Sequence, residues 1–315
     1  MPMAKNQWTI KPQDAGQRLD VFLADKIPDM TRSAIAKKLK AGAGTINGKR
    51  ATVHAFLKTG QKVIFEQNMV TTVRHEKQIR VAEQINVKLK DIIIKETPDW
   101  IVVNKPAGLL VHPDSQHKDG TLVDLLIAHF PPLGKVGEDL DRSGIVHRLD
   151  KDVSGLMVVA KTQNAFDDLK NQFSHHQTQK IYLALVHGAP PKEEGEIRFS
   201  IARSASRPRM AARPEGDAGG KVAWSHYRVI KKRKNASLLE VQILSGRSHQ
   251  IRAHLYALDC PIVGDQLYKP KTKPNLQTDH IMLQSIKLTF KDPATGEPET
   301  FEIKPDPSFD DLMKN

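Results

Sequence analysis

From residue 91 onward the chain is a succession of short apolar runs that do not alternate regularly with helical segments. Helical spacing of apolar residues is confined to residues 121–130, 162–173 and 248–259, with Thr162 and Ser248 as predicted N-caps. No internal repeat is present. We therefore expect an α+β fold built around a mostly antiparallel sheet. The strand-like runs lie in DIIIKETPDWIVVNKP, LLVHP, KIYLALVHG, VAWSHYRVI, SLLEVQIL and a final hairpin, SIKLTFKDPATGEPETFEI.

The basic charge of the chain is concentrated in its first part. The sequence holds 48 Lys+Arg and 36 Asp+Glu, a net charge of +12, which suits a polyanionic partner. Residues 1–70 hold 12 Lys+Arg and 5 Asp+Glu, so this region alone contributes +7. Cys260 is the single cysteine, which excludes an intrachain disulfide. Without a secretory signal, a membrane-spanning stretch or a long heptad pattern, we expect a cytoplasmic protein, no membrane partner and a monomer.

Residues 1–70 read as a small α+β module. The stretch RLDVFLADKI places Leu19, Phe22 and Leu23 on one face of a helix. A second helix is predicted to begin after Thr31 as N-cap. The Asn47-Gly48 pair predicts a tight hairpin turn, and KVIF, residues 62–65, predicts a closing strand. The polar, mixed segment 71–90 reads as a linker to a second domain over 91–315.

The cations of this module are candidates for RNA binding. On charge alone, the lysines of the second helix are explained equally well as an ordinary solvated face. The basic hairpin directly after that helix favours RNA. The order of elements over residues 17–65 also resembles the small RNA-binding domain of ribosomal protein S-four. The candidate RNA-binding residues here are Arg32, Lys37, Lys38, Lys49 and Arg50.

The stretch GIVHRLDKDVSGLMVVAKT, residues 144–162, places charged residues between two apolar runs. If residues 145–150 are extended, Val146, Arg148 and Asp150 share one side of the strand. Asp150 then lies where a strand gives way to a turn, and the nearby Arg148 guanidinium would keep it ionised. A structural ion pair explains this local pattern at least as well as a catalytic carboxylate.

Four ordered motifs resemble pseudouridine synthases of the RluA type, the large-subunit ribosomal RNA branch. They are NKPAGLLVHP at 104–113, HRLDKDVSG at 147–155, QKIYLALVHG at 179–188 and SGRSHQIRAHL at 245–255. The resemblance implies a mostly antiparallel catalytic core with helices and loops flanking a cleft. It also implies isomerisation of uridine to pseudouridine in RNA, a reaction that requires no cofactor. At position 153 the chain has valine where the family usually has threonine. The turn therefore lacks a hydroxyl, while the Asp150 carboxylate is retained.

The resemblance also implies roles for individual residues. Asp150 would be the essential carboxylate, acting at C1′, at uracil C6 or as a base at C2′. Tyr182 would stack on the uracil, and Arg247 would pair with Asp150, with Arg252 as the alternative partner. Arg148 would fill the place of the everted base. Lys105 and His147, which lie within the first two motifs, are further candidates for substrate binding.

The RNA partner is expected to be 23S ribosomal RNA. Transfer RNA is an alternative target, and a non-catalytic RNA-binding or ribosome-assembly protein is an alternative function. The basic loop RSASRPRMAAR, residues 203–213, adds Arg207 and Arg209 as candidate contacts to the RNA backbone. A metal hydrolase is disfavoured because His249 and His254 are five residues apart and cannot share one helix face, so no metal site is expected.

Overall fold

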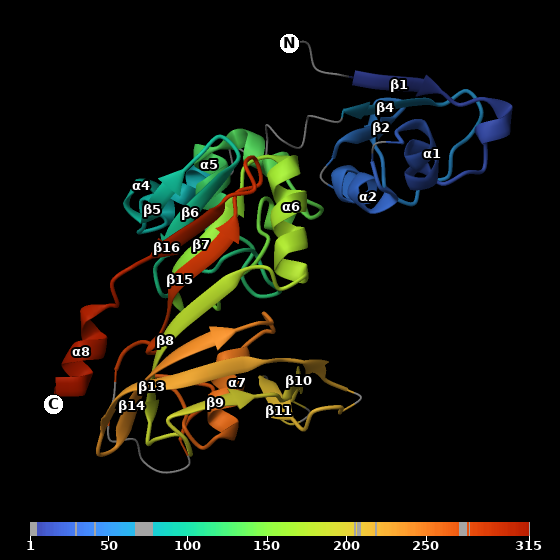
Figure 1. Cartoon of the computed structure of the whole chain (residues 1–315). Coiled ribbons are helices and arrows are strands. Elements are labelled where there is room, and N and C mark those ends of the chain that lie inside the picture. The colour runs from blue at the N-terminus through green and yellow to red at the C-terminus, as the bar shows by residue number, and fades with distance from the viewer. Residues whose placement is uncertain are drawn as a thin grey trace.

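The protein consists of a small N-terminal unit and a larger unit built on a long sheet (Figure 1). The two units have separate hydrophobic clusters, one formed by residues between Ile10 and Phe65 and the other, main cluster by residues between Leu89 and Met313. None of the helices in the described residues has the length and hydrophobicity needed to cross a bilayer. The computed structural model describes residues 5–28, 30–40, 42–66, 78–204, 206, 209–217, 219–270, 276 and 278–314.

The N-terminal unit contains the two predicted helices and the predicted hairpin. The Thr31 hydroxyl accepts a hydrogen bond from the Ala34 backbone N–H at 3.3 Å, so the predicted N-cap is confirmed. Asn47 and Gly48 both have positive φ, 50° and 75°, as the tight turn requires. A first strand, which the sequence did not predict, pairs antiparallel with the last. The elements are β1 (Lys5–Thr9), η1 (Pro12–Asp14), α1 (Leu19–Lys26), α2 (Arg32–Lys40), β2 (Gly44–Ile46), β3 (Lys49–Arg50) and β4 (Lys62–Glu66), with sheet order β1-β4-β2-β3.

The larger unit is organised around one long sheet, and the predicted α+β, mostly antiparallel fold is confirmed. Among the described strands, β7 and β15 are the only parallel neighbours of this sheet, and they pair over two positions alone. Their junction requires glycine at 155, where φ is +119° and a Cβ would lie 2.2 Å from the Ser285 carbonyl oxygen. The sheet order is β5 (Ile93–Glu96), β6 (Trp100–Lys105), β7 (Ser154–Ala160), β15 (Leu283–Lys291), β8 (Gln179–His187), β14 (Ala236–Ile243), β13 (Ser225–Arg233) and β9 (Glu194–Ile197), with β16 (Pro298–Glu302) on β15.

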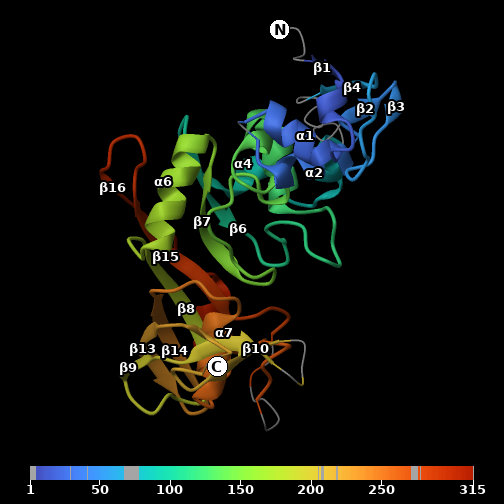
Figure 2. The same cartoon turned by 90° about the vertical axis from the view of Figure 1, so that its right-hand side faces the viewer.

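Helices cover both faces of this sheet. Thr121 and Thr162 cap two of them, and the Thr162 hydroxyl accepts from the Ala165 N–H as predicted. Helix α6 runs along β7 (Figure 2). A separate three-stranded sheet lies beside α7. The helices are α4 (Leu89–Ile92), α5 (Leu122–His129), η2 (Pro131–Lys135), η3 (Leu140–Arg142), α6 (Gln163–Ser174), α7 (Gln250–Ala257) and α8 (Pro307–Lys314), and the small sheet is β10 (Ser200–Arg203), β11 (Met210–Arg213) and β12 (Lys221–Val222).

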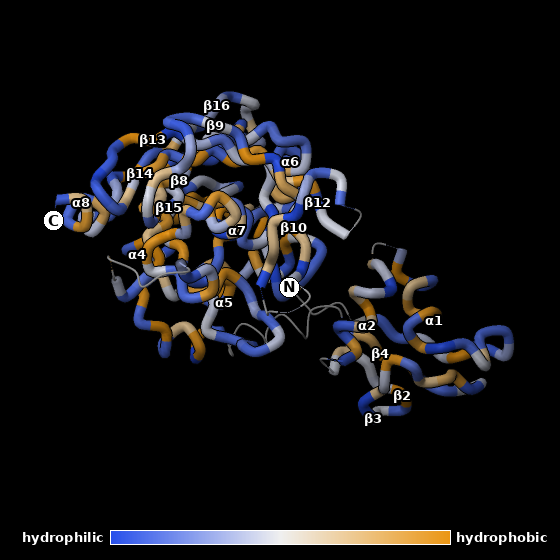
Figure 3. Tube along the Cα trace, turned by 90° about the horizontal axis from the view of Figure 1, so that it is seen from below, coloured by the Kyte–Doolittle hydropathy of each residue, from blue (hydrophilic) through white to orange (hydrophobic). Residues whose placement is uncertain are grey.

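The core follows from the alternation of side chains along the strands. On β6, Ile101 and Val103 belong to the main cluster, shared with α5, while Trp100 and Val102 belong to a second cluster shared with α6. Trp100 is fully buried. Hydrophobic segments accordingly lie inside each unit and hydrophilic loops outside (Figure 3). The sheet is therefore a rigid support from which loops carry side chains outward.

Two expectations from the sequence differ from the structure. Residues 145–150 form an irregular loop rather than a strand, with one isolated bridge from Ile145 to Val159. The pairing stops there because the His147 ring, rather than a backbone carbonyl, accepts the Val158 N–H at 3.0 Å. In the expected linker, residues 71–77 lie outside the described residues. Residues 78–84 are helical, and Ala82 packs against the main cluster of the larger unit.

Candidate active site

Asp150 lies in the loop before β7, at a small pocket of about 70 Å³. Tyr182 of β8 and residues 246–252, which lead into α7, line the pocket. The Asp150 side chain is 18% exposed, so it is held by the protein while solvent still reaches it. A wider hollow of about 470 Å³ adjoins the pocket and shares Arg148, Tyr182 and Arg247 with it. The site thus has a narrow pocket at Asp150, with room for one small group, beside a wider hollow with room for the groups attached to it.

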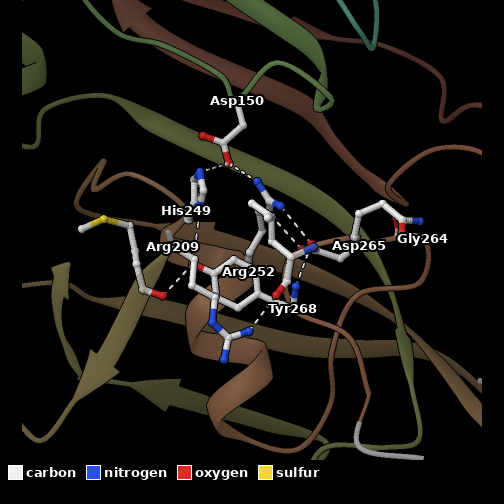
Figure 4. Close-up of polar contacts among 10 residues, drawn as sticks. Asp150, Arg209, His249, Arg252, Gly264, Asp265 and Tyr268 are labelled. Atoms are coloured by element: carbon white, nitrogen blue, oxygen red, sulfur yellow. Dashed lines mark hydrogen bonds and ion pairs between the residues drawn. The ribbon is translucent and has the colours of Figure 1, made fainter. Parts of the chain in front are cut away.

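Asp150 is bonded to an arginine that a second carboxylate holds from behind (Figure 4). Nη1 of Arg252 on α7 donates to Oδ2 of Asp150 at 2.9 Å. Nε and Nη2 of the same guanidinium donate to the two oxygens of Asp265 at 2.8 and 2.9 Å. The Asp265 side chain is fully buried, and its Oδ1 also accepts from the backbone N–H groups of Leu267 and Tyr268. Arg252 is therefore fixed in position before any substrate binds.

The Arg252–Asp265 pair is held in its charged form. Burial raises the pKa of Asp265, but the bonds from Arg252 outweigh it and hold that pKa below its usual range. Burial lowers the pKa of Arg252, and the two carboxylates raise it on balance. The expected pair of Asp150 with Arg247 is wrong, because the Arg247 Nε donates to the Val222 carbonyl at 3.3 Å. Arg252, the alternative partner, makes the bond instead.

The loop before α7 is set by a glutamine rather than by the predicted Ser248 cap. The helix begins after His249, which has a left-handed backbone with φ of 53° and makes no side-chain cap. Gln250 Oε1 accepts from the Ser245 hydroxyl and from the Arg247 N–H at 2.8 and 3.0 Å. This network turns the His249 ring toward Asp150, with 3.8 Å between Nε2 and Oδ2.

The hydrogen bonds of His249 define its tautomer. The Tyr268 hydroxyl donates to the Met210 carbonyl at 2.8 Å, so its oxygen accepts from His249 Nδ1 at 3.2 Å. Burial is the main cause that lowers the pKa of His249, and the Asp150 charge opposes it. A neutral ring with a proton on Nδ1 presents the lone pair of Nε2 to the pocket. His249 can therefore accept one hydrogen bond from a molecule bound beside Asp150.

Tyr182 and Arg148 complete the walls of the pocket. Tyr182 is buried, and burial together with the Asp150 charge raises the pKa of its hydroxyl far above the usual range. The phenol therefore stays protonated. Arg148 is exposed and does not bond to Asp150. Its Nη1 donates at 2.9 Å to Nε2 of His112, whose Nδ1 donates to the Pro113 carbonyl at 2.9 Å. The expectation that Arg148 keeps Asp150 ionised is therefore wrong, because Arg252 is the guanidinium bonded to it.

A carboxylate, a fixed arginine, a protonated phenol and an exposed arginine surround one pocket, and they come from three of the four sequence motifs, 147–155, 179–188 and 245–255. The family model described as RNA pseudouridylate synthase matches residues 99–257, which include Asp150, Tyr182 and Arg252. The chain belongs to this family. The family indicated by the motifs is confirmed, and the protein is an RNA pseudouridine synthase.

Relatives of the synthase match nearly the whole chain. An uncharacterized RNA pseudouridine synthase of Synechocystis is 36% identical over 284 residues, which cover 90% of this chain and 84% of the relative. Ribosomal large subunit pseudouridine synthase D of Haemophilus influenzae is 33% identical over 309 residues, covering 94% and 90%. The structure of human RNA pseudouridylate synthase domain containing 4 has a TM-score of 0.58 at 22% identity, covering 76% and 97%, and shares the fold.

Two further residues that were predicted to contact the substrate, Lys105 and His147, form hydrogen bonds within the protein instead. Lys105 is fully buried, and its ammonium donates to the carbonyls of Pro106, Leu109 and Lys151 at 2.8 to 2.9 Å. It ties the turn after β6 to the loop at Lys151 and does not line the pocket. His147 lines the wider hollow, but its Nε2 is bonded to the backbone as described above. Its role is to hold the Asp150 loop against β7.

The predicted RNA-binding residues do not form one cluster. Arg32 is bonded to Asp20 at 2.9 Å, and Lys37 is bonded to Asp139 of the larger unit. Lys49 is exposed, and so is Arg50, which donates to the Lys40 carbonyl at 2.5 Å. Lys38 is half-buried in α2. Arg209 donates to the Leu267 carbonyl and lies over the rings of Tyr256 and Tyr268. Arg207 lies outside the described residues.

Sequence reasoning missed three residues that organise the site. Asp265 holds Arg252, His112 holds Arg148, and Lys180 lines the wider hollow. A signal existed for Lys180, because it lies two positions before Tyr182 in a strand and so shares its face. Asp265 had no local signal, since its partner is in another element and the two meet only in the folded chain.

Proposed function

We propose that the synthase converts uridine to pseudouridine in large-subunit ribosomal RNA, with Asp150 acting on an everted uridine. The observation that carries this proposal is the 2.9 Å bond between Asp150 and Arg252 at the pocket, with Asp265 bonded behind the arginine. A carboxylate bonded to a fixed guanidinium at the edge of a pocket is positioned as a nucleophile or a base requires.

The bonding pattern leaves one carboxylate oxygen available. Within the described residues, hydrogen bonds reach only Oδ2 of Asp150, so Oδ1 is available for chemistry. Addition to C1′, addition to uracil C6 and removal of a C2′ proton each need one such oxygen. In every case the N1–C1′ bond breaks, a C5–C1′ bond forms, the C5 proton leaves to solvent and N1 takes up a proton. No atom is gained or lost overall, so the reaction requires no cofactor.

The walls of the pocket suit a single pyrimidine ring. Tyr182 offers an aromatic face, and its protonated hydroxyl can donate a hydrogen bond. His249 Nε2 can accept one hydrogen bond from the ring or the ribose. A uridine enters the pocket only after it has left its stack, at a cost of a few kcal/mol. Arg148 is exposed at the rim, and its guanidinium can move from His112 into the vacated place.

Ribosomal RNA is the preferred target because the relative from Haemophilus influenzae and three others that match this chain are called ribosomal large subunit pseudouridine synthase D. The N-terminal unit, with an exposed Lys49-Arg50 hairpin, supports a second contact with a structured RNA. Its likeness to the S-four domain stays a prediction, and so does the monomeric state. An enzyme of this specificity works where ribosomes are assembled, in the cytoplasm.

The proposal is tested by Asp150→Asn, with Asp152→Asn as a matched control that makes the same charge change on an exposed neighbour. Asp150→Asn should abolish tritium release from ribosomal RNA containing 5-tritiated uridine, while RNA binding and thermal stability stay near wild type. Asp152→Asn should release tritium normally. Release by Asp150→Asn at the wild-type rate would refute the role of Asp150. Pseudouridine mapping of total RNA with and without the enzyme identifies the target, and a site only in transfer RNA would refute the ribosomal assignment.

A further inference from the structure

Lys180 is a buried lysine without a protein acceptor. It lies on β8 and is 5% exposed. Its ammonium has no carboxylate or carbonyl partner among the described residues, and its one close contact of note is the Phe173 ring, 5.4 Å from Nζ. Lys105 is equally buried, yet three carbonyl oxygens satisfy its ammonium. Because the stem of Lys180 is buried while the residue lines the hollow, the acceptor for its ammonium is supplied from the hollow, by solvent or by a bound anion.

The hollow beside Lys180 carries positive charge only. Its lining includes Arg142, Arg148, Lys170, Lys180 and Arg247, and it contains no Asp or Glu. Its volume of about 470 Å³ leaves room for a solvated anionic group. Such a lining repels other cations and attracts phosphate, which an ammonium binds as a point charge.

The position of the ammonium links this hollow to the Asp150 pocket. Gly246 lines both cavities, and a Cβ added there would lie 4.0 Å from Lys180 Nζ. The glycine therefore leaves the approach to the ammonium open. Tyr182, two residues further along β8, forms the other shared wall. A nucleotide whose base occupied the narrow pocket would leave its backbone in the wider hollow, within reach of Lys180.

We propose that Lys180 binds a backbone phosphate of the RNA strand next to the uridine that enters the Asp150 pocket. This inference rests on the proposed function, because it takes the strand in the hollow to be the one that delivers the target base. Burial lowers the pKa of the Lys180 ammonium to about 8, so most of it is still charged at neutral pH. A bound phosphate would supply the missing acceptor and favour the charged form.

The test compares RNA binding by Lys180→Met, Lys180→Arg and a matched control, Lys161→Met. Lys161 is similarly shielded but lies outside the hollow, bonded to Glu96 and to the Thr97 carbonyl. The probe is a 23S ribosomal RNA transcript without modifications, bound over a series of KCl concentrations. Loss of one phosphate contact reduces the slope of log K against log salt by about 1.

Lys180→Met is expected to show this smaller slope with an unchanged or higher melting temperature, because a charge with no protein partner is removed. Lys180→Arg, which keeps the charge, and Lys161→Met should keep the wild-type slope. A wild-type slope for a folded Lys180→Met, or a loss of stability like that of an ordinary structural lysine, would overturn the proposal. If the variant fails to fold, acylation of Lys180 in the wild type decides the question. Acylation of Lys180 should slow when inorganic phosphate is added, whereas acylation of the exposed Lys49 should keep its rate. Equal rates of Lys180 acylation with and without phosphate would overturn the proposal.

The binding comparison is repeated in the Asp150→Asn background, which separates the two proposals. A smaller slope there supports the phosphate contact whether or not Asp150 proves essential. Normal tritium release by Asp150→Asn, together with a slope difference at Lys180, would refute the catalytic assignment alone.

Discussion

The carboxylate behind Arg252 is open to a sharp test, because Asp265→Asn keeps its volume and removes its charge. The asparagine oxygen can still accept from Arg252 Nη2 and from the Leu267 and Tyr268 backbone. Its amide nitrogen, however, would face the Arg252 Nε–H, which lies 2.8 Å from the present oxygen. Two donors would then oppose each other in a fully buried place.

The magnitude follows from this one lost bond. A hydrogen bond to a charged group contributes about 1.5–3 kcal/mol, so the free energy of unfolding should fall by about 2 kcal/mol. The guanidinium would keep its bond to Asp150 but lose its fixed orientation. Since a displacement of about 1 Å in a catalytic group can cost about 100-fold in rate, we expect kcat to fall by about that factor. RNA affinity should stay near wild type, because Asp265 is buried away from the surface.

The assay is single-turnover tritium release with enzyme in excess, alongside urea denaturation and equilibrium RNA binding. The control is Asp310→Asn, which makes the same charge change on the exposed side of α8. Loss of stability with an unchanged rate would show that Asp265 only supports the fold. A parallel loss of RNA affinity and rate would show that it shapes the binding surface, and either result would refute its role in positioning Arg252.

Two further predictions concern pH and salt. The pKa of His147 is lowered to about 3 by burial, so as pH falls through about 6.5 the unfolded chain takes up a proton that the folded chain excludes. Stability should therefore decline by about 2 kcal/mol from this group between about pH 7 and about pH 5. In urea titrations His147→Gln should lose that part of the decline, whereas the control His129→Gln, at an exposed position, should keep it. Parallel curves of unfolding free energy against pH for His147→Gln and wild type would contradict the argument. Replacing Lys49 and Arg50 with alanine should weaken RNA binding and reduce the salt slope by about 2, while alanine at Lys304 and Lys314 should not, and an unchanged slope would show that the hairpin does not bind RNA.

Features governed by local rules were predictable from the sequence. The caps at Thr31 and Thr162, the Asn47-Gly48 turn and the helix over residues 122–129 follow from neighbours a few residues apart, and the structure contains them. The antiparallel character of the sheet followed from the order of apolar runs. The first strand was missed because KNQWT lacks an apolar run, and its pairing with β4 is what stabilises it.

Of the residues that surround the pocket, the motifs indicated Asp150, Tyr182 and Arg252, but neither Asp265 nor the bonding pattern was predicted. Arg247 lies just before α7 and was the expected partner for Asp150, but its backbone N–H donates to the Gln250 side chain and its Nε donates to the Val222 carbonyl. Lys105 lies in a motif with polar neighbours, and the distant Lys151 carbonyl, which joins those of the nearby Pro106 and Leu109 at its ammonium, shows that it is structural. Such contacts depend on segments that meet in three dimensions, and spacing along the chain carries no record of them.

The two-position contact between β7 and β15 separates the sheet into two sides, and the residues of the candidate site come from both sides. Asp150 comes from the side that holds β5, β6 and β7, whereas Arg252 and Asp265 come from the side that holds β8, β13 and β14. If Asp150 and Arg252 make up the reaction centre as proposed, neither side holds it alone, and the centre is complete only where both sides are folded and packed together.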